Sequence, residues 1–244
     1  MTDKSFFEVV ETRRNIRRYK PDPIPDGHIE KILDAARYAQ SGANGQSWEF
    51  VVVKNAQLRS KLAQILAEER TEFGTPIEMS RVPEMRHLGS TRGAYGGHIG
   101  IKIAPATIIV LGDPRTFQAT VLCANYLSGE WDHFHMNIGN CTQIITLAAC
   151  ALGLQGQWVT TFRTAETKMK QLLGIPDIYR IYVVVPIGYP DYDSPPPYRR
   201  PLTEIVHYDK FDMSKYRTSE QVQDWIKELR QRTTPHYHVR REPA

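Results

Sequence analysis

Residues 40–55 read QSGANGQSWEFVVVKN. The first half combines small residues with hydroxyl and amide side chains, and the second half is an apolar run with three consecutive valines. The valine run predicts a strand over residues 49–54, because β-branched side chains favour extended backbone. The first half has the composition of an ordinary turn, but its small residues and amide donors also suit the approach of a flat, carbonyl-rich ring. Both interpretations of this loop stay open on its residues alone.

The composition is that of an ordinary globular protein. The chain has 244 residues, of which 41% are hydrophobic and 24% are charged. No linker-like stretch divides it, so we expect one domain of helices and strands with appendages. Three cysteines without a CxxC spacing argue against a disulfide framework or a cysteine-based zinc site. The start lacks the apolar segment of a signal peptide, and the longest apolar stretch, near residues 144–154, is too short to span a bilayer. We therefore expect a reduced, cytoplasmic protein that has no membrane partner.

Local patterns predict an alternation of helices and strands. Ser5 and Glu8 form a capping box, which predicts a short helix ending near residue 14. Asp26 is expected to cap the next helix, which ends just before residue 40. Further helices are expected at residues 56–72, 142–154 and 219–232, and further strands at 104–112, 156–161 and 180–188. Residues 73–100 are rich in Gly and Pro and are expected to be loop with short helical pieces.

Basic residues gather in two short segments, although the net charge is only +4. One is residues 13–20, which contain four arginines, and the other is residues 199–200. Such clusters occur at solvated helix ends, on nucleic-acid surfaces and around small phosphates. No nucleic-acid-binding motif accompanies them, so we expect no nucleic acid partner. Arg13, Asn15 and Arg17 alternate along the chain, which would turn three polar donors toward one side.

Four segments in order carry a resemblance. RRNIRRYKPDPIP (residues 13–25) precedes ARYAQSGANGQSWEFVVVKN (36–55); ALGLQGQWVTTF (151–162) comes before LLGIPD (172–177), and PPPYRRPLTEIVHYDKF (195–211) follows. Together they resemble the nitroreductase family of FMN-dependent oxidoreductases, over nearly the whole chain to about residue 211.

The resemblance implies cofactor contacts in four segments, which are Arg13, Arg14, Asn15 and Arg17; Ser41, Gly42, Asn44 and Gln46; Thr160, Thr161 and Phe162; and Arg199 with Arg200. In the family, the first segment holds the FMN phosphate, ribityl chain and pyrimidine edge. The second approaches the flavin from the partner subunit, the third lies beside the isoalloxazine with an N–H facing N5, and the fourth binds phosphate. This sequence departs from the family pattern at Asn15, where Ser is common, at Gln40 and Ser47, where Pro is frequent, and at Pro197, where a Lys often stands.

The resemblance also implies a fold and an activity. The fold is an α+β sandwich with an antiparallel or mixed sheet flanked by helices, in an intertwined homodimer. Residues 1–211 would form the FMN-binding domain. Residues 212–244 are more than the minimal family fold requires, and the helix face that carries Trp225 suggests that this helical extension docks on the partner subunit. The reaction would pass two electrons from NAD(P)H through flavin N5 to a small planar acceptor, such as a nitroaromatic or quinone, with ping-pong kinetics. A flavin oxidase, desaturase or reductive dehalogenase is the alternative, and a non-catalytic basic binding module is a further one.

Other candidate residues concern the substrate, since the flavin supplies the chemistry and no side-chain base is assigned. His133 and His135 lie in a DHFH segment, which suggests either a metal site or, as we favour, a substrate-facing segment. No third metal ligand is evident near them, so we expect no metal. Tyr95 and His98 lie in the glycine-rich stretch GAYGGHIG (93–100), which is either a cover over the active site or a plain loop. Trp158 is expected in the core.

Overall fold

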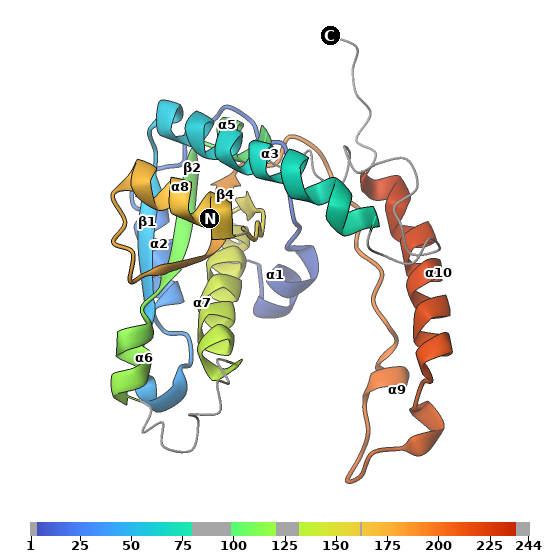
Figure 1. The fold of residues 1–244 in the computed structure, drawn as a ribbon. Coiled ribbons are helices and arrows are strands. Elements are labelled where there is room, and N and C mark those ends of the chain that lie inside the picture. Colours follow the sequence, from blue (N-terminus) through green and yellow to red (C-terminus); the bar gives the residue numbers. More distant parts are fainter. Residues whose placement is uncertain (1–3, 80–98, 121–131, 162, 238–244) are drawn as a thin grey trace.

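The computed structural model describes residues 4–79, 99–120, 132–161 and 163–237 (Figure 1). Its centre is a four-stranded sheet in the order β1-β2-β4-β3, with every pairing antiparallel. The strands are β1 (Trp48–Val53), β2 (Ala106–Gly112), β3 (Gln155–Gly156) and β4 (Arg180–Gly188). The expected α+β class with an antiparallel sheet is therefore confirmed, and the valine run of the opening stretch forms most of β1.

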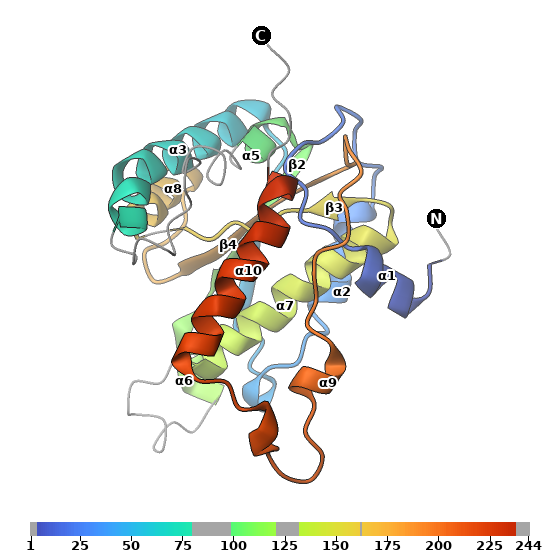
Figure 2. The same cartoon turned by 90° about the vertical axis from the view of Figure 1, so that its right-hand side faces the viewer.

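Helices cover both faces of the sheet (Figures 1 and 2). One face packs on α2 (His28–Ala36) and α7 (Asp132–Ala151), and the other packs on α3 (Ala56–Met79), α5 (Ile99–Ile103) and α8 (Arg163–Leu173). Alternate residues of β2 supply the two cores, with Ile108 and Val110 facing α7 and Ile109 and Leu111 facing α3. The sheet is thus the middle layer of three, which is why β2 is buried along its whole length.

Several element boundaries differ from the sequence expectations. The capping box at Ser5 is confirmed, and α1 (Phe6–Thr12) begins there. The expected cap at Asp26 is wrong, because α2 starts from the left-handed Gly27 and has no side-chain cap. Residues 73–79 continue α3 instead of forming loop, and α7 begins at Asp132, ten residues before the expected start at 142. Neither α8 nor α6 (Pro114–Thr120) was expected from the sequence.

The strand expected at residues 156–161 is only partly formed, and Pro186 explains why. Gly156 pairs with Ile187 and Val159 bridges Val184, so the register continues across the gap. Between them Gln157 donates to the Pro186 carbonyl at 3.2 Å, but a proline has no N–H to return a second bond. The ladder is therefore interrupted between Gly156 and Val159, and Trp158 lies in the interruption.

The C-terminal segment stands apart from the three-layer body (Figures 1 and 2). It contains α9 (Leu202–Ile205), the 3₁₀ turn η5 (Met213–Lys215) and α10 (Ser219–Tyr237). We call residues 202–237 the arm. The expected helix at 219–232 is confirmed and runs longer. Within the described residues, no helix combines the length and apolar composition that crossing a membrane requires.

Candidate functional site

Arg13 and Arg199 concentrate positive charge where α1 ends. Arg13 is the residue that caps α1, and its extended backbone leads the chain away from the helix. Burial lowers the pKa of Arg13, and the Arg199 and Arg14 guanidinium groups lower it further by repulsion. With the described residues, Arg13 makes no ion pair. Two guanidinium groups within electrostatic reach of each other, with no carboxylate among the described residues to neutralise Arg13, offer donors that an anion such as phosphate could accept.

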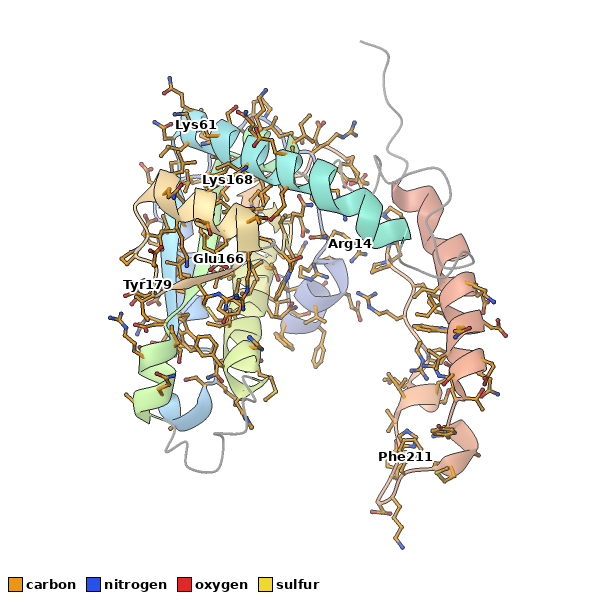
Figure 3. All side chains as sticks on the ribbon, in the orientation of Figure 1. Arg14, Lys61, Glu166, Lys168, Tyr179 and Phe211 are labelled. Atoms are coloured by element: carbon orange, nitrogen blue, oxygen red, sulfur yellow. The ribbon has the colours of Figure 1, made fainter. Side chains whose placement is uncertain are left out.

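Arg14 holds the chain around that pair. Arg14 donates through Nε to the Ser194 carbonyl at 3.2 Å and through Nη1 to the carbonyls of Glu11 and Arg13. Figure 3 shows Arg14 between α1 and the connection to the arm. These bonds fasten the segment that precedes Arg199 to the last turn of α1. The two N–H groups of Arg14 Nη2 have no described partner in these bonds and would be the ones left for a ligand.

Arg200 makes its described contacts inside the arm. Its Nε pairs with Glu204 Oε2 at 3.3 Å, and its guanidinium carbon lies 5.7 Å from the centroid of the Trp225 ring. Arg217 also lies over this ring, at 4.8 Å. The Trp225 ring is therefore half-buried beneath two arginines of its own chain, and its docking on a partner stays a prediction.

Asn15 joins the arginine segment to the turn after β3. Its Oδ1 accepts a hydrogen bond from the Trp158 backbone N–H at 2.7 Å, while the next residue, Ile16, donates to the Gly156 carbonyl at 3.1 Å. Trp158 is 38% exposed, so the expectation that it belongs to the core is wrong. The physical reason is the broken ladder, since the backbone held by Asn15 turns this ring out of the sheet.

The turn carries polar atoms that the described chain leaves unsatisfied. Gln157 Oε1 and Thr161 Oγ1 are buried and have no hydrogen-bond partner among the described residues, and Thr160 is exposed. A buried polar atom without a partner costs roughly 1–3 kcal/mol, and a polar ligand is one group that could satisfy these two. Phe162 lies outside the described residues.

Gly100 explains one part of the glycine-rich stretch. A Cβ placed there would meet the Arg17 carbonyl at 3.0 Å and Gln157 Oε1 at 3.1 Å. Only glycine therefore allows α5 to approach the arginine segment and the turn so closely. Tyr95 and His98 lie outside the described residues.

The loop that precedes β1 is held in a strained conformation. Ala43, Asn44 and Gln46 have φ values of 50°, 54° and 47°, a region that costs a residue with a Cβ roughly 1–2 kcal/mol. Ser41 Oγ accepts from the Gln46 N–H at 3.1 Å, and Ser47 is buried. Strain of this kind gathers at functional sites. We call residues 40–47 the strained loop.

Two asparagines of α7 form hydrogen bonds with the start of this loop. Asn137 Oδ1 accepts from the Gly42 N–H at 3.2 Å, and Asn140 Nδ2 donates to the Gln40 carbonyl at 3.2 Å. The sequence reasoning missed both residues, because an asparagine in a largely apolar helix gives no local signal of what it contacts. Asn137 is the buried member of the pair, at 5% exposed.

The arginine pair and the strained loop lie toward opposite ends of α7. Asn137 holds the loop, while Cys150 contacts Thr12 and Val9 of α1, the helix that ends at Arg13. With a rise of about 1.5 Å per residue, these two points are about 20 Å apart along the helix. The structure thus brings together the first, third and fourth segments of candidate residues and leaves the second at the other end.

His133 and His135 are exposed near the start of α7. The His135 ring meets the Tyr182 ring edge-on with centroids 5.5 Å apart, and Phe134 packs on the same ring at 5.6 Å. Burial raises the pKa of Tyr182. Among the described residues, no group of three or more His, Cys, Asp or Glu side chains could hold a metal ion. The arrangement offers an aromatic surface with ring nitrogens for a flat molecule.

Comparison with known proteins identifies the family. The family model described as the nitroreductase family matches residues 10–189, which include the arginine segment, the strained loop and the turn at Thr160. The chain belongs to the nitroreductase family. It is accordingly an oxidoreductase, and the resemblance read from the four sequence segments is confirmed.

The similar proteins are named for different reactions. A protein of Archaeoglobus fulgidus, provisionally named NADH dehydrogenase/NAD(P)H nitroreductase, is 29% identical over 75% of this chain and 84% of its own length. Mouse iodotyrosine deiodinase 1 is 27% identical over 84% of this chain and 70% of its own. The solved structure of the NADPH:FMN oxidoreductase from Vibrio harveyi complexed with NAD+ covers 95% of this chain and 86% of that chain, at 20% identity and a TM-score of 0.65. At this identity the last comparison shows the fold alone.

Proposed function

We propose that this nitroreductase-family protein is an FMN-dependent oxidoreductase that uses NAD(P)H. The observation that supports this most is the Arg13–Arg199 pair, in which two guanidinium groups repel each other without a described counter-ion. The unsatisfied atoms of Gln157 and Thr161 lie in the turn beside it. A phosphate joined to a ring rich in carbonyl and N–H groups meets both needs, and FMN has that chemistry.

The chain would hold FMN with the candidate residues that lie near the C-terminal end of α7. Arg13 and Arg199 would bind the phosphate, with Arg14 fixing the segment before Arg199. Arg17 and the free amide nitrogen of Asn15 would bind the polar parts of the flavin, and the turn at Thr160 and Thr161 would face its reactive edge. When bound, FMN supplies two-electron chemistry between NAD(P)H and a small planar acceptor such as a nitroaromatic or quinone.

The visible absorption spectrum of the purified protein tests this proposal, first in air and then anaerobically with NAD(P)H. A yellow protein that bleaches at once supports both the cofactor and the reductant. A colourless protein that will not take up added FMN contradicts it. Initial rates at several NAD(P)H and acceptor concentrations should then give parallel double-reciprocal lines, and intersecting lines would exclude the ping-pong order.

We further propose a homodimer in which the arm lies on a second copy and the strained loop reaches the flavin of that copy. Large apolar side chains of the arm are exposed in the single chain, including Leu202, Tyr208 and Phe211, with Tyr208 at 84%. Figure 3 shows Phe211 at the tip of the arm, away from the body. A second copy would cover these side chains and would bring its own strained loop to the arginine pair of the first.

Light scattering tests the dimer. The wild-type chain is expected at twice its monomer mass of 28.0 kDa. A variant with Leu202→Ser, Tyr208→Ser and Phe211→Ser should sediment and scatter as a monomer while keeping its helix content. A wild-type monomer that binds FMN normally would reject the arm's role.

A reductive dehalogenase is the second candidate, because iodotyrosine deiodinases of several animals resemble this chain over 82–85% of its length. A halogenated phenol is a flat aromatic molecule that the surface formed by His135 and Tyr182 would suit. Anaerobic incubation of the dithionite-reduced, FMN-loaded protein with an iodinated phenol distinguishes the two. Release of iodide together with slow oxidation of NAD(P)H favours the dehalogenase. A yellow protein that reacts neither with NAD(P)H nor with the iodinated phenol favours an oxidase or desaturase.

A further inference from the structure

We infer that Asn137 and Asn140 are positioning residues that set the strained loop for flavin binding, an inference that rests on the proposed function. Neither residue belongs to the four segments that carry the family resemblance. Both lie on α7, three residues apart, so their side chains share one face of the helix. They contact the loop at Gly42 and Gln40, immediately before its left-handed residues.

The two amides act in opposite senses. The Gly42 N–H needs an acceptor, so the atom of Asn137 that faces it must be oxygen, and the Gln40 carbonyl needs a donor, so the atom of Asn140 that faces it must be nitrogen. One asparagine thus holds the loop by its N–H and the other by its carbonyl. Together they fix both the position and the orientation of the backbone that enters the turn.

Asn137 is not explained by stability. Its side chain is 5% exposed, and its Nδ2 is buried without a partner among the described residues. The loop that it holds contains three non-glycine residues with positive φ, one of them Ala43, which lacks a polar side chain to compensate. A buried amide that is half unsatisfied and a strained turn both disfavour folding. Their joint presence points to a loop shape that a ligand requires.

The other end of the loop is also held by a hydrogen bond. The asparagines therefore control the conformation of the entry of the turn alone. The Asp113 N–H, at the end of β2, donates to the Ser47 carbonyl at 2.8 Å. Inside the loop, the Asn44 N–H donates to the Ser41 carbonyl at 3.1 Å and the Gly45 N–H to the Gly42 carbonyl at 3.0 Å. Release at Gly42 would therefore free the entry of the turn while its exit stays on the sheet, and the turn would relax from its left-handed conformation.

Aspartate substitutions test this inference, because they should act oppositely at the two positions. Asn137→Asp keeps an oxygen acceptor for Gly42 in either protonation state and replaces the unpartnered nitrogen by a second carboxyl oxygen. Burial of that carboxyl group should lower the melting temperature, but FMN affinity should stay within about threefold of wild type. Asn140→Asp replaces the donor by an oxygen facing the Gln40 carbonyl, and affinity should fall about fivefold. Asn137→Ala should weaken FMN binding about tenfold, and Gln143→Ala, an exposed amide on the same helix, should change nothing.

The dissociation constant is read from quenching of FMN fluorescence, and visible circular dichroism of the bound flavin reports whether its surroundings change. A purely structural role would lower the melting temperature of Asn137→Ala and leave both readouts at their wild-type values, which would overturn the inference. Equal affinity of wild type, Asn137→Ala and Asn140→Asp would overturn it as well.

Hydrogen exchange separates this inference from the proposed function. If wild-type protein binds no FMN, the proposed function fails, and the tether is then judged on the FMN-free chain. The backbone amides of Gly42, Asn44 and Gln46 should exchange at least tenfold faster in Asn137→Ala than in wild type or Asn137→Asp. Unchanged exchange would show that Asn137 does not set the loop.

Discussion

Two groups of charged side chains in this chain differ in how their charges are balanced. Glu166 is buried, accepts from the Ile181 N–H at 3.0 Å and pairs with both Lys170 and Arg180 at 3.2 Å. Arg13 and Arg199 instead repel each other, and Arg13 has no described carboxylate partner. The first group is complete within one chain and serves the fold. The second has no carboxylate to neutralise it among the described residues, which is why we propose that it binds an anion.

Of the substitutions considered, removal of Glu166, the centre of the complete group, should have the largest effect on the free energy of unfolding. Glu166→Ala leaves Lys170 buried without its carboxylate and should lower the free energy of unfolding by about 3–5 kcal/mol. Urea unfolding of the variant measures this loss. The matched control is Lys168→Ala on the same helix, since Lys168 pairs with Glu68 at 3.5 Å on the surface and such pairs contribute about 0–1 kcal/mol. Figure 3 shows Glu166 and Lys168 on α8. A loss no larger than that of the control would show that the buried network contributes little.

Removing a member of the incomplete group should spare the fold and impair binding. Arg13→Ala and Arg199→Ala each remove a charged hydrogen-bond donor and should weaken FMN binding by about 1.5–3 kcal/mol, which is roughly 10- to 150-fold. Because each change also relieves repulsion, the FMN-free protein should unfold at the same urea concentration as wild type or a higher one. Fluorescence titration with FMN measures the affinity, and Lys20→Ala, an exposed cation of the same segment, is the control. Variants that bind FMN normally would remove the main support for the cofactor.

Gly100 packs against both the arginine segment and the turn at Gln157. Its substitution should have an effect of intermediate size, on both stability and FMN affinity. Gly100→Ala forces its Cβ toward the Arg17 carbonyl and Gln157 Oε1, and overpacking of this kind costs about 1–3 kcal/mol. Both the melting temperature and the FMN affinity should fall, since the displaced atoms lie in the proposed binding region. Gly139→Ala in α7 meets nothing within 4 Å and should be neutral or stabilising. Equal behaviour of the two alanine variants would contradict the close packing seen at α5.

The sequence predicted best where local pattern and tertiary context agree. The apolar run at residues 180–188 forms β4 with the expected limits, and the Ser5 capping box starts α1 as expected. The strand at 156–161 failed because its partner residue is Pro186, which only the sheet register reveals. Helix α3 continued past its expected end although the segment that follows is rich in glycine and proline.

The site could be predicted only through the resemblance. Arg13 and Arg199 lie at opposite ends of the chain, and no spacing rule places them together, whereas the family pattern did and the structure agrees. The roles of Arg14 and Arg200 in binding carbonyls and Glu204 depend on neighbours that only the fold supplies. The tethers at Asn137 and Asn140 are contacts between a helix and a loop nearly a hundred residues earlier, which explains why sequence reasoning did not find them.

The smallest effect concerns the ion pair between the buried carboxylate of Asp113 and the exposed guanidinium of Arg115. Arg115 donates to both carboxylate oxygens, at 3.0 and 2.8 Å, and this hydrogen bonding holds the pKa of Asp113 below its ordinary value. A carboxylate whose pKa is lower in the folded state stabilises the fold above its unfolded pKa, near 4, and that contribution disappears as the pH falls through the lower, folded pKa. Between pH 5 and pH 2, Asp113→Asn should therefore lose less stability than wild type does. Urea unfolding at each pH measures the two slopes, and parallel slopes would show that the Asp113–Arg115 pair contributes nothing. The slope would remain above zero in the variant, because Glu8 and Asp212 also have lowered pKa values through hydrogen bonds with Ser5 and Ser214.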